Sequence, residues 1–98
     1  QMKTEGMQHL RCMNVSEADW IAKEVYTDRV YTPEGIRTWP GMRVVDVGGS
    51  IGLFAIFAKK CLRASSVMVI EPAMGSWSLC QENLVASFGE THGVQIHR

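Results

Sequence analysis

The chain has 98 residues with ten basic and ten acidic side chains, so its formal net charge is zero, and 46% of its residues are hydrophobic. This even balance gives no electrostatic footprint for nucleic acid, and no apolar run is long enough to span a bilayer. The chain also shows no signal-peptide pattern at its start, so we expect a cytoplasmic protein with neither nucleic acid nor membrane as a partner.

Residues 1 to 15 show no periodicity and are expected to form a frayed lead-in to a domain at 16 to 98. The sequence Ser16-Glu17-Ala18-Asp19 resembles a capping box, which predicts a helix that runs to about Tyr26.

The next segment predicts a small hairpin. Residues 29 to 32 and 36 to 39 flank Pro33-Glu34-Gly35, a turn sequence, and the hairpin is expected to cover a ligand. Tyr26 and Tyr31 lie near it, and both readings stay open for them: contact with the ligand, or packing of an amphipathic aromatic ring.

A short apolar strand then breaks into a glycine-rich turn in the sequence Val-Val-Asp-Val-Gly-Gly-Ser-Ile-Gly at 44 to 52. Asp46 lies near the end of the strand. Gly48 and Gly52 flank a loop that must bend tightly while a ligand lies against bare backbone. A crossover helix with apolar residues on nearly every turn is predicted from Leu53 to Leu62. This combination is typical of a turn that holds a small cofactor.

The charge of Asp46 favours S-adenosylmethionine as that cofactor. Dinucleotides and nucleoside triphosphates present phosphate, which a neighbouring carboxylate would repel. A dinucleotide fingerprint starting at Gly48 would also require glycine at 50 and glycine or alanine at 53, where the chain has Ser50 and Leu53. S-adenosylmethionine carries a sulfonium and an α-ammonium, from which Asp46 can accept directly or through water.

A second acidic residue follows the next predicted strand. Val-Met-Val-Ile at 67 to 70 is a β-branched apolar run, and Glu71 comes directly after it, nineteen residues beyond Gly52. In a strand-helix-strand unit its carboxylate reaches the same sheet edge as the glycine turn, where it can accept from both hydroxyls of a ribose. A helix at 75 to 88, ended by Gly89, and a third strand at 94 to 97 complete the chain.

The chain has three cysteines without Cys-x-x-Cys spacing, namely Cys12, Cys61 and Cys80. They are expected to be free thiols, and no metal site is predicted. Three histidines near the termini lack a convergent partner and are expected to be solvated: His9, His92 and His97.

These motifs carry a family resemblance. The segment 26 to 36, the turn sequence continuing into Leu-Phe, and Val-Ile-Glu-Pro together resemble the start of an FkbM-type methyltransferase domain, from about Ser16 onward. That family usually has Ala-Asn between the glycines, where this chain has Gly49 and Ser50. The resemblance implies methylation of a hydroxyl oxygen on a small molecule or sugar. The cofactor-binding residues it implies are Asp46, Gly48, Gly49, Ser50 and Gly52 at the methionine end and Glu71 at the ribose.

The predicted fold class is α/β: a Rossmann-like methyltransferase fold truncated to about three parallel strands in the order 3-2-1, with an N-terminal helix and the small hairpin. Such domains need about seven strands, so we expect the cofactor-binding half, incomplete for catalysis, to which no catalytic residue is assigned. The strand at 43 to 47 would lie mid-sheet in the full fold. Its unpaired edge is expected to promote self-association.

Two other functions remain open. The chain could be a non-catalytic module or remnant that binds S-adenosylmethionine or a nucleoside. It could also be a fragment of a nicotinamide-dependent oxidoreductase, which shares the strand-turn-helix arrangement, although Asp46, Ser50 and Leu53 argue against it.

Overall fold

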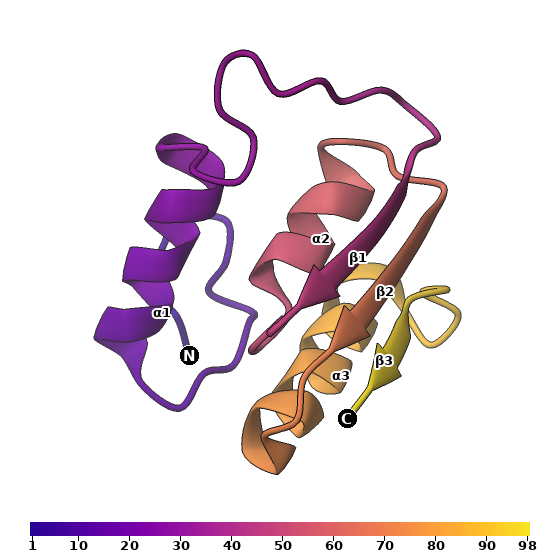
Figure 1. Ribbon diagram of the computed structural model, residues 1–98. Coiled ribbons are helices and arrows are strands. Elements are labelled where there is room, and N and C mark those ends of the chain that lie inside the picture. Colours follow the sequence, from indigo (N-terminus) through magenta and orange to yellow (C-terminus); the bar gives the residue numbers. More distant parts are fainter.

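The computed structural model describes residues 1–98 and contains a three-stranded parallel sheet with helices beside it (Figure 1). The strands are β1 (Arg43–Val47), β2 (Ser66–Ile70) and β3 (Gln95–His97), in the order β1-β2-β3. The helices are α1 (Val15–Ala22), the π-helix η1 (Lys23–Thr27), α2 (Leu53–Lys60) and α3 (Met74–Phe88). The predicted α/β class with three parallel strands is confirmed. None of the helices has the length and apolar character needed to cross a bilayer.

The two connecting helices cover only one face of the sheet. Figure 1 shows α2 and α3 on the same side of the three strands. Val67 and Val69 of β2 are buried on that side. On the opposite face Val45 and Val47 of β1 are 62% and 76% exposed. Parallel sheets are usually covered on both faces, so this face is unusually apolar for a solvent-exposed surface.

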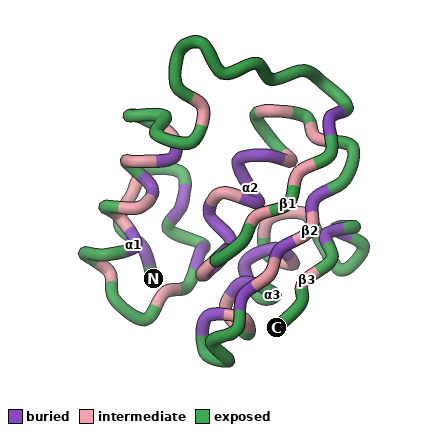
Figure 2. The backbone as a smooth tube through the Cα atoms, viewed as in Figure 1, coloured by how far each residue is buried: buried purple, intermediate pink, exposed green.

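The lead-in before α1 is packed rather than frayed. It contains no helix or strand, yet Met2 and Leu10 are each 2% exposed and belong to the hydrophobic core. The Met2 N–H donates to the Leu10 carbonyl at 3.2 Å, which closes the segment on itself. Figure 2 shows buried stretches in this segment near the N-terminus. Apolar burial fixes the lead-in, a long-range effect that a search for periodicity does not detect.

The first helix starts two residues earlier than its capping-box sequence suggests. Asn14 is the N-cap, because its Oδ1 accepts from the Glu17 N–H at 2.8 Å, and Ser16 lies inside the first turn. Asp19, predicted as part of the box, instead accepts from the Thr4 N–H at 2.9 Å. It therefore ties the lead-in to the helix.

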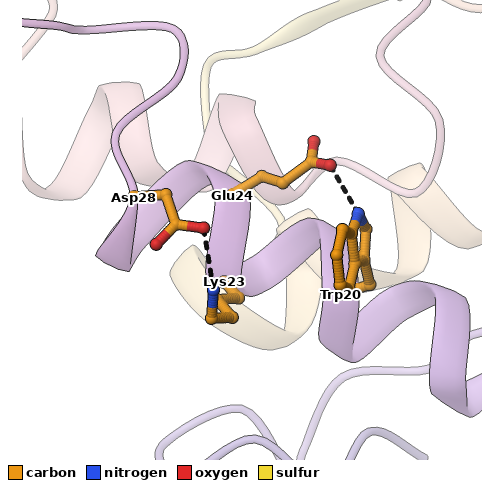
Figure 3. A network of polar contacts seen from close by, with 4 residues as sticks. All are labelled: Trp20, Lys23, Glu24 and Asp28. Atoms are coloured by element: carbon orange, nitrogen blue, oxygen red, sulfur yellow. Dashed lines mark hydrogen bonds and ion pairs between the residues drawn. The ribbon is translucent and has the colours of Figure 1, made fainter.

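The helix loosens into a π-turn at its end, where the Asp28 N–H donates to the Lys23 carbonyl at 2.8 Å. Figure 3 shows polar contacts on this segment. Lys23 Nζ lies 2.9 Å from Asp28 Oδ2, and Trp20 Nε1 donates to Glu24 Oε1 at 2.5 Å. Both contacts are exposed to solvent, so they contribute little to stability, on the order of 0 to 1 kcal/mol each.

The predicted hairpin is wrong. Residues 28–42 contain no strand. Two successive turns occupy the region, with the Thr32 N–H donating to the Arg29 carbonyl and the Ile36 N–H to the Pro33 carbonyl, each at 3.0 Å. Local i to i+3 bonds replace a cross-strand ladder, and Arg29 adopts a left-handed conformation that no strand residue has.

The three cysteines are free. The three histidines differ in their exposure to solvent. His92 is buried, and its Nδ1 accepts from the Val94 N–H at 3.0 Å, so the expectation of a solvated side chain was wrong for this residue. Burial lowers the pKa of His92, and nearby Lys59 lowers it further. His9 and His97 are exposed, as predicted.

Candidate functional site

The turn between β1 and α2 depends on three residues with a left-handed backbone. Gly48, Ser50 and Gly52 have φ of 75°, 51° and 94°. The Gly48 N–H extends the parallel ladder by donating to the Ile70 carbonyl at 2.8 Å. Glycine adopts this conformation without strain, whereas serine does so at a cost of roughly 1 kcal/mol. The turn therefore follows from the glycine spacing seen in the sequence.

Gly49 and Gly52 are required by close packing. A Cβ atom at Gly49 would collide with Cγ1 of Val69 and would lie 3.1 Å from Oδ2 of Asp46. A Cβ at Gly52 would lie 3.0 Å from Sγ of Cys80. The turn thus packs directly on β2 and α3. This close packing explains why position 49 holds glycine rather than alanine.

Glu71 holds the turn in place. Its Oε1 accepts from the Ser50 N–H at 2.8 Å, and its Oε2 accepts from the Ala73 N–H at 2.9 Å. The side chain is buried. The sequence placed Glu71 at the same sheet edge as the turn, and the structure does the same. The sequence did not indicate that each carboxylate oxygen of Glu71 already accepts a backbone hydrogen bond.

Asp46 presents a buried acceptor without a partner. Its Oδ2 is shielded from solvent and accepts no hydrogen bond. Burial raises the pKa of Asp46, and the charge of Glu71 raises it further. The same surroundings act on Cys80, whose pKa rises to about 12 through burial and the two carboxylates. The two carboxylates predicted from the sequence therefore lie close enough to influence each other.

Two small pockets flank the turn, and both include Ser50 and Ile51. One, of about 90 Å³, contains Asp46 and is walled by Tyr31 and Phe54, whose rings lie 5.1 Å apart between centroids. The other, of about 70 Å³, lies on the side of the lead-in and α1, and α3 contributes one residue to it. Its remaining lining residues are Cys12, Met13, Asn14, Glu17, Ala18, Ile21 and Ser76.

The two tyrosines named in the sequence analysis have different surroundings in the structure. Tyr31 lines the pocket that contains Asp46. Tyr26 instead packs edge-on against Phe57, with ring centroids 4.8 Å apart. Burial raises the pKa of Tyr26 to about 12, with a further contribution from Cys61. Tyr31 is therefore the tyrosine at the candidate site, although the loop that carries it is not a hairpin.

Sequence reasoning missed Asn83. This residue of α3 is 1% exposed, and its side chain bonds the backbone of the turn at Ile51 and of the lead-in at Arg11. The available signal was an uncharged polar residue directly before Leu84, inside a helical run whose other buried positions are mostly apolar. A buried asparagine requires hydrogen-bond partners.

The chain is similar to curated methyltransferases. It is 36% identical over 73 residues to the 31-O-demethyl-FK506 methyltransferase FkbM of Streptomyces tacrolimicus, which covers 74% of this chain and 28% of the relative. It is 31% identical over 83 residues to Methyltransferase 1 of Beauveria bassiana, covering 84% and 31%. It is 32% identical over 68 residues to Methyltransferase sdnD of Sordaria araneosa, covering 69% and 26%.

No family model matches the chain. The chain spans less than one third of the length of each of the three relatives. The aligned share of this chain is nevertheless large in all three, and the names of all three designate methyltransferases. These similarities support an FkbM-type methyltransferase domain, the family that the sequence motifs resemble.

Proposed function

We propose that the chain binds S-adenosylmethionine at the turn 48–52 and forms the cofactor-binding half of an enzyme that methylates a hydroxyl of a small molecule or sugar. The observation that carries the proposal is the buried, unpartnered Oδ2 of Asp46 beside a pocket at the glycine turn. The similarity to curated methyltransferases supports the same reaction class.

Asp46 suits a cationic group. A buried carboxylate oxygen without a donor costs about 1 to 3 kcal/mol, and Glu71 adds a second negative charge nearby. An ammonium would supply both the missing donor and the compensating charge. A phosphate at the same position would face two carboxylates, which disfavours a nucleotide bound through its phosphates.

Glu71 suits the ribose of the same ligand. An ionised carboxylate has about four acceptor positions, and the Ser50 and Ala73 N–H groups occupy one on each oxygen. One acceptor position therefore remains on each oxygen for a hydroxyl. The same side chain would then fix the turn and bind the nucleoside, with the methionine end directed to Asp46.

The pocket at Asp46 is small. Its volume of about 90 Å³ is below the roughly 300 to 1,000 Å³ of sites that enclose a whole drug-sized ligand, so it fits only one end of the cofactor. Gly48 and Gly49 leave the backbone bare on one side, and Tyr31 and Phe54 form an aromatic wall on another. S-adenosylmethionine, when bound, supplies an electrophilic methyl group for transfer to the acceptor oxygen.

We propose that other parts of the domain bind the acceptor and supply the general base. The chain corresponds to 26 to 31% of the length of its relatives, and neither carboxylate at the turn is free to act as a base once it binds the cofactor. The name of the Streptomyces relative designates a 31-O-demethyl compound, which agrees with a hydroxyl acceptor.

Calorimetry with S-adenosylhomocysteine tests the cofactor assignment. We expect the unmodified chain to bind it, Asp46→Ala to weaken binding by roughly tenfold or more, and Asp28→Ala, which removes an exposed carboxylate on the same chain, to bind normally. NADH serves as the competing ligand. Tight NADH binding without a response to S-adenosylhomocysteine would identify an oxidoreductase fragment instead.

A methyl-transfer assay on the same chain separates the enzyme from a binding module. We expect binding without turnover on a broad panel of hydroxyl acceptors, since the acceptor site is assigned elsewhere in the domain. Robust turnover that Asp46→Ala abolishes would show that the chain is a complete enzyme.

A further inference from the structure

Asn83 joins three separate parts of the chain. Its Oδ1 accepts from the Arg11 N–H at 2.8 Å, and its Nδ2 donates to the carbonyls of Arg11 and Ile51, both at 3.0 Å. These partners lie 72 and 32 residues away in the sequence, in the lead-in and in the glycine turn. A single side chain on α3 therefore bonds both segments at once.

The two segments that Asn83 joins both line one pocket. The pocket of about 70 Å³ is lined by Cys12 and Met13 of the lead-in and by Ser50 and Ile51 of the turn. Asn83 is not among its lining residues, so it can influence a ligand only through the backbone that it holds.

An apolar residue at this position could not replace Asn83. The Arg11 N–H and the Arg11 carbonyl would lose bonds that are partly buried, and the Ile51 carbonyl would lose one that is fully buried. The lead-in contains no helix or strand, and its other hydrogen bonds to distant residues go to Asp19 of α1 and to Ser87 of α3, not to the turn.

We propose that Asn83 is a positioning residue that fixes the lead-in against the glycine turn and thereby holds the backbone of Ile51, which lines both pockets beside the turn, including the one proposed for the cofactor. The first part depends only on the hydrogen bonds and the packing. The second part, the effect on a ligand, rests on the proposed function.

The three cysteines allow a direct test by thiol labelling and mass spectrometry. Cys12 follows Arg11 in the lead-in and is half-buried, Cys61 is exposed, and Cys80 is buried. Cys12 reports local release of the lead-in, Cys80 reports global unfolding, and Cys61 is the accessible reference. Ratios of variant to unmodified chain are compared at each cysteine, so that differences in intrinsic thiol reactivity cancel.

The variants are Asn83→Leu and Asn83→Ser, with Leu84→Ala as a control that weakens the same helix turn without removing these hydrogen bonds. In the Asn83 variants we expect Cys12 labelling to accelerate roughly 5- to 30-fold, with little change at Cys80. In Leu84→Ala both cysteines should accelerate together. If Asn83→Leu unfolds, Cys80 is labelled at once, and the milder Asn83→Ser then decides the question.

The proposal is overturned if Cys12 labelling in Asn83→Ser is unchanged, or if Cys12 and Cys80 accelerate equally. Calorimetry with S-adenosylhomocysteine on the same variants tests the effect on the site. Weaker binding in Asn83→Ser supports it, whereas normal binding despite released Cys12 overturns it. If the unmodified chain binds no S-adenosylhomocysteine, the proposed function fails, while the labelling ratios still decide whether Asn83 holds the lead-in.

Discussion

The backbone N–H of Ser50 donates to Oε1 of Glu71 at 2.8 Å, so a carboxylate at the end of β2 fixes the turn that follows β1. A second bond, from the Ala73 N–H to Oε2, holds the same carboxylate at the start of α3. Two adjacent strand ends and one helix are thereby locked together. Hydrogen bonds to a charged group contribute about 1.5 to 3 kcal/mol each.

We expect Glu71→Ala to lower the free energy of unfolding by about 3 kcal/mol, because two backbone donors lose their acceptor. Glu71→Gln should cost less, since the amide oxygen can still accept one of the two bonds. Urea denaturation measures both. Equal stability of Glu71→Ala and the unmodified chain would contradict the role of Glu71 as the clamp of the turn.

Gly49 and Val69 should show strong coupling. Gly49→Ala introduces a Cβ that collides with Val69 Cγ1, which we expect to cost about 1 to 3 kcal/mol. In the background of Val69→Ala the same substitution should cost less, since the colliding methyl group is gone. The double-mutant cycle in urea denaturation measures this coupling.

Gly48→Ala is the matched control for that cycle. A Cβ at Gly48 meets nothing within 4 Å, so its cost of about 1 kcal/mol comes from the positive φ alone. Val69→Ala should not relieve it. Equal relief at both glycines, or at neither, would be inconsistent with a collision specific to Gly49.

Replacing Ser50 with a residue that tolerates its positive φ should stabilise the chain. With φ of 51°, serine is strained, whereas glycine or asparagine adopts this conformation more readily. We expect Ser50→Gly and Ser50→Asn to raise the free energy of unfolding by up to about 1 kcal/mol, and the β-branched Ser50→Val to lower it. Thermal denaturation at one pH ranks the three variants, and Ser50→Val as the most stable would contradict the assignment.

The parts of the site that could be predicted from the sequence are those fixed by local geometry. Gly48 and Gly52 stand where the backbone must turn, and Asp46 and Glu71 follow from parallel strands whose carboxyl ends share one sheet edge. Turn chemistry and strand periodicity act over a few residues, so they are visible in a single sequence.

The features that could not be predicted depend on distant contacts or on competition between local structures. The burial of Met2 and the bonds of Asn83 to Arg11 require the folded chain. The prediction of a hairpin at 28–42 failed for a different reason. Apolar segments around Pro33 are compatible with both a hairpin and successive turns. Hydrogen bonding to Arg29 and Pro33 favours the turns.

Asp46 should make stability depend on pH. Its pKa is raised in the folded chain, so the folded state binds a proton more tightly than the unfolded state does. Stability from this group is fully present below the ordinary pKa of 3.8 and is lost as pH rises through the raised pKa. Asp46→Asn should therefore stabilise the chain at neutral pH by about 1 to 3 kcal/mol, and this gain should vanish in acid.

Urea denaturation across the pH range measures this dependence, with Asp28→Asn, at an exposed ion pair, as the control without such a gain. Binding of a cationic ligand should follow the opposite course, strengthening as pH rises and Asp46 ionises. A gain for Asp46→Asn that is constant from acid to neutral pH would contradict the burial of an unpaired carboxylate.

The open face and edge of β1 should promote self-association. Val45 and Val47 expose 62% and 76% of their surface on the uncovered side of the sheet, and β1 pairs only with β2. Unpaired apolar edges pair with other chains, so we expect a second copy to associate along β1. Val45→Lys should shift the chain toward monomer in sedimentation velocity, because burying an unpaired ammonium at this contact is costly.

Ile36→Lys is the matched control for Val45→Lys, because Ile36 is 60% exposed on the loop at 28–42 and lies outside the sheet. It adds the same charge, so it should leave the association unchanged if the sheet surface is responsible. If both variants shift the chain equally toward monomer, net charge is responsible rather than the sheet surface. An unmodified chain that sediments as a single monomer at high concentration would show that β1 does not promote association. Covering this face in a larger domain would bury the same valines and should therefore remove the association.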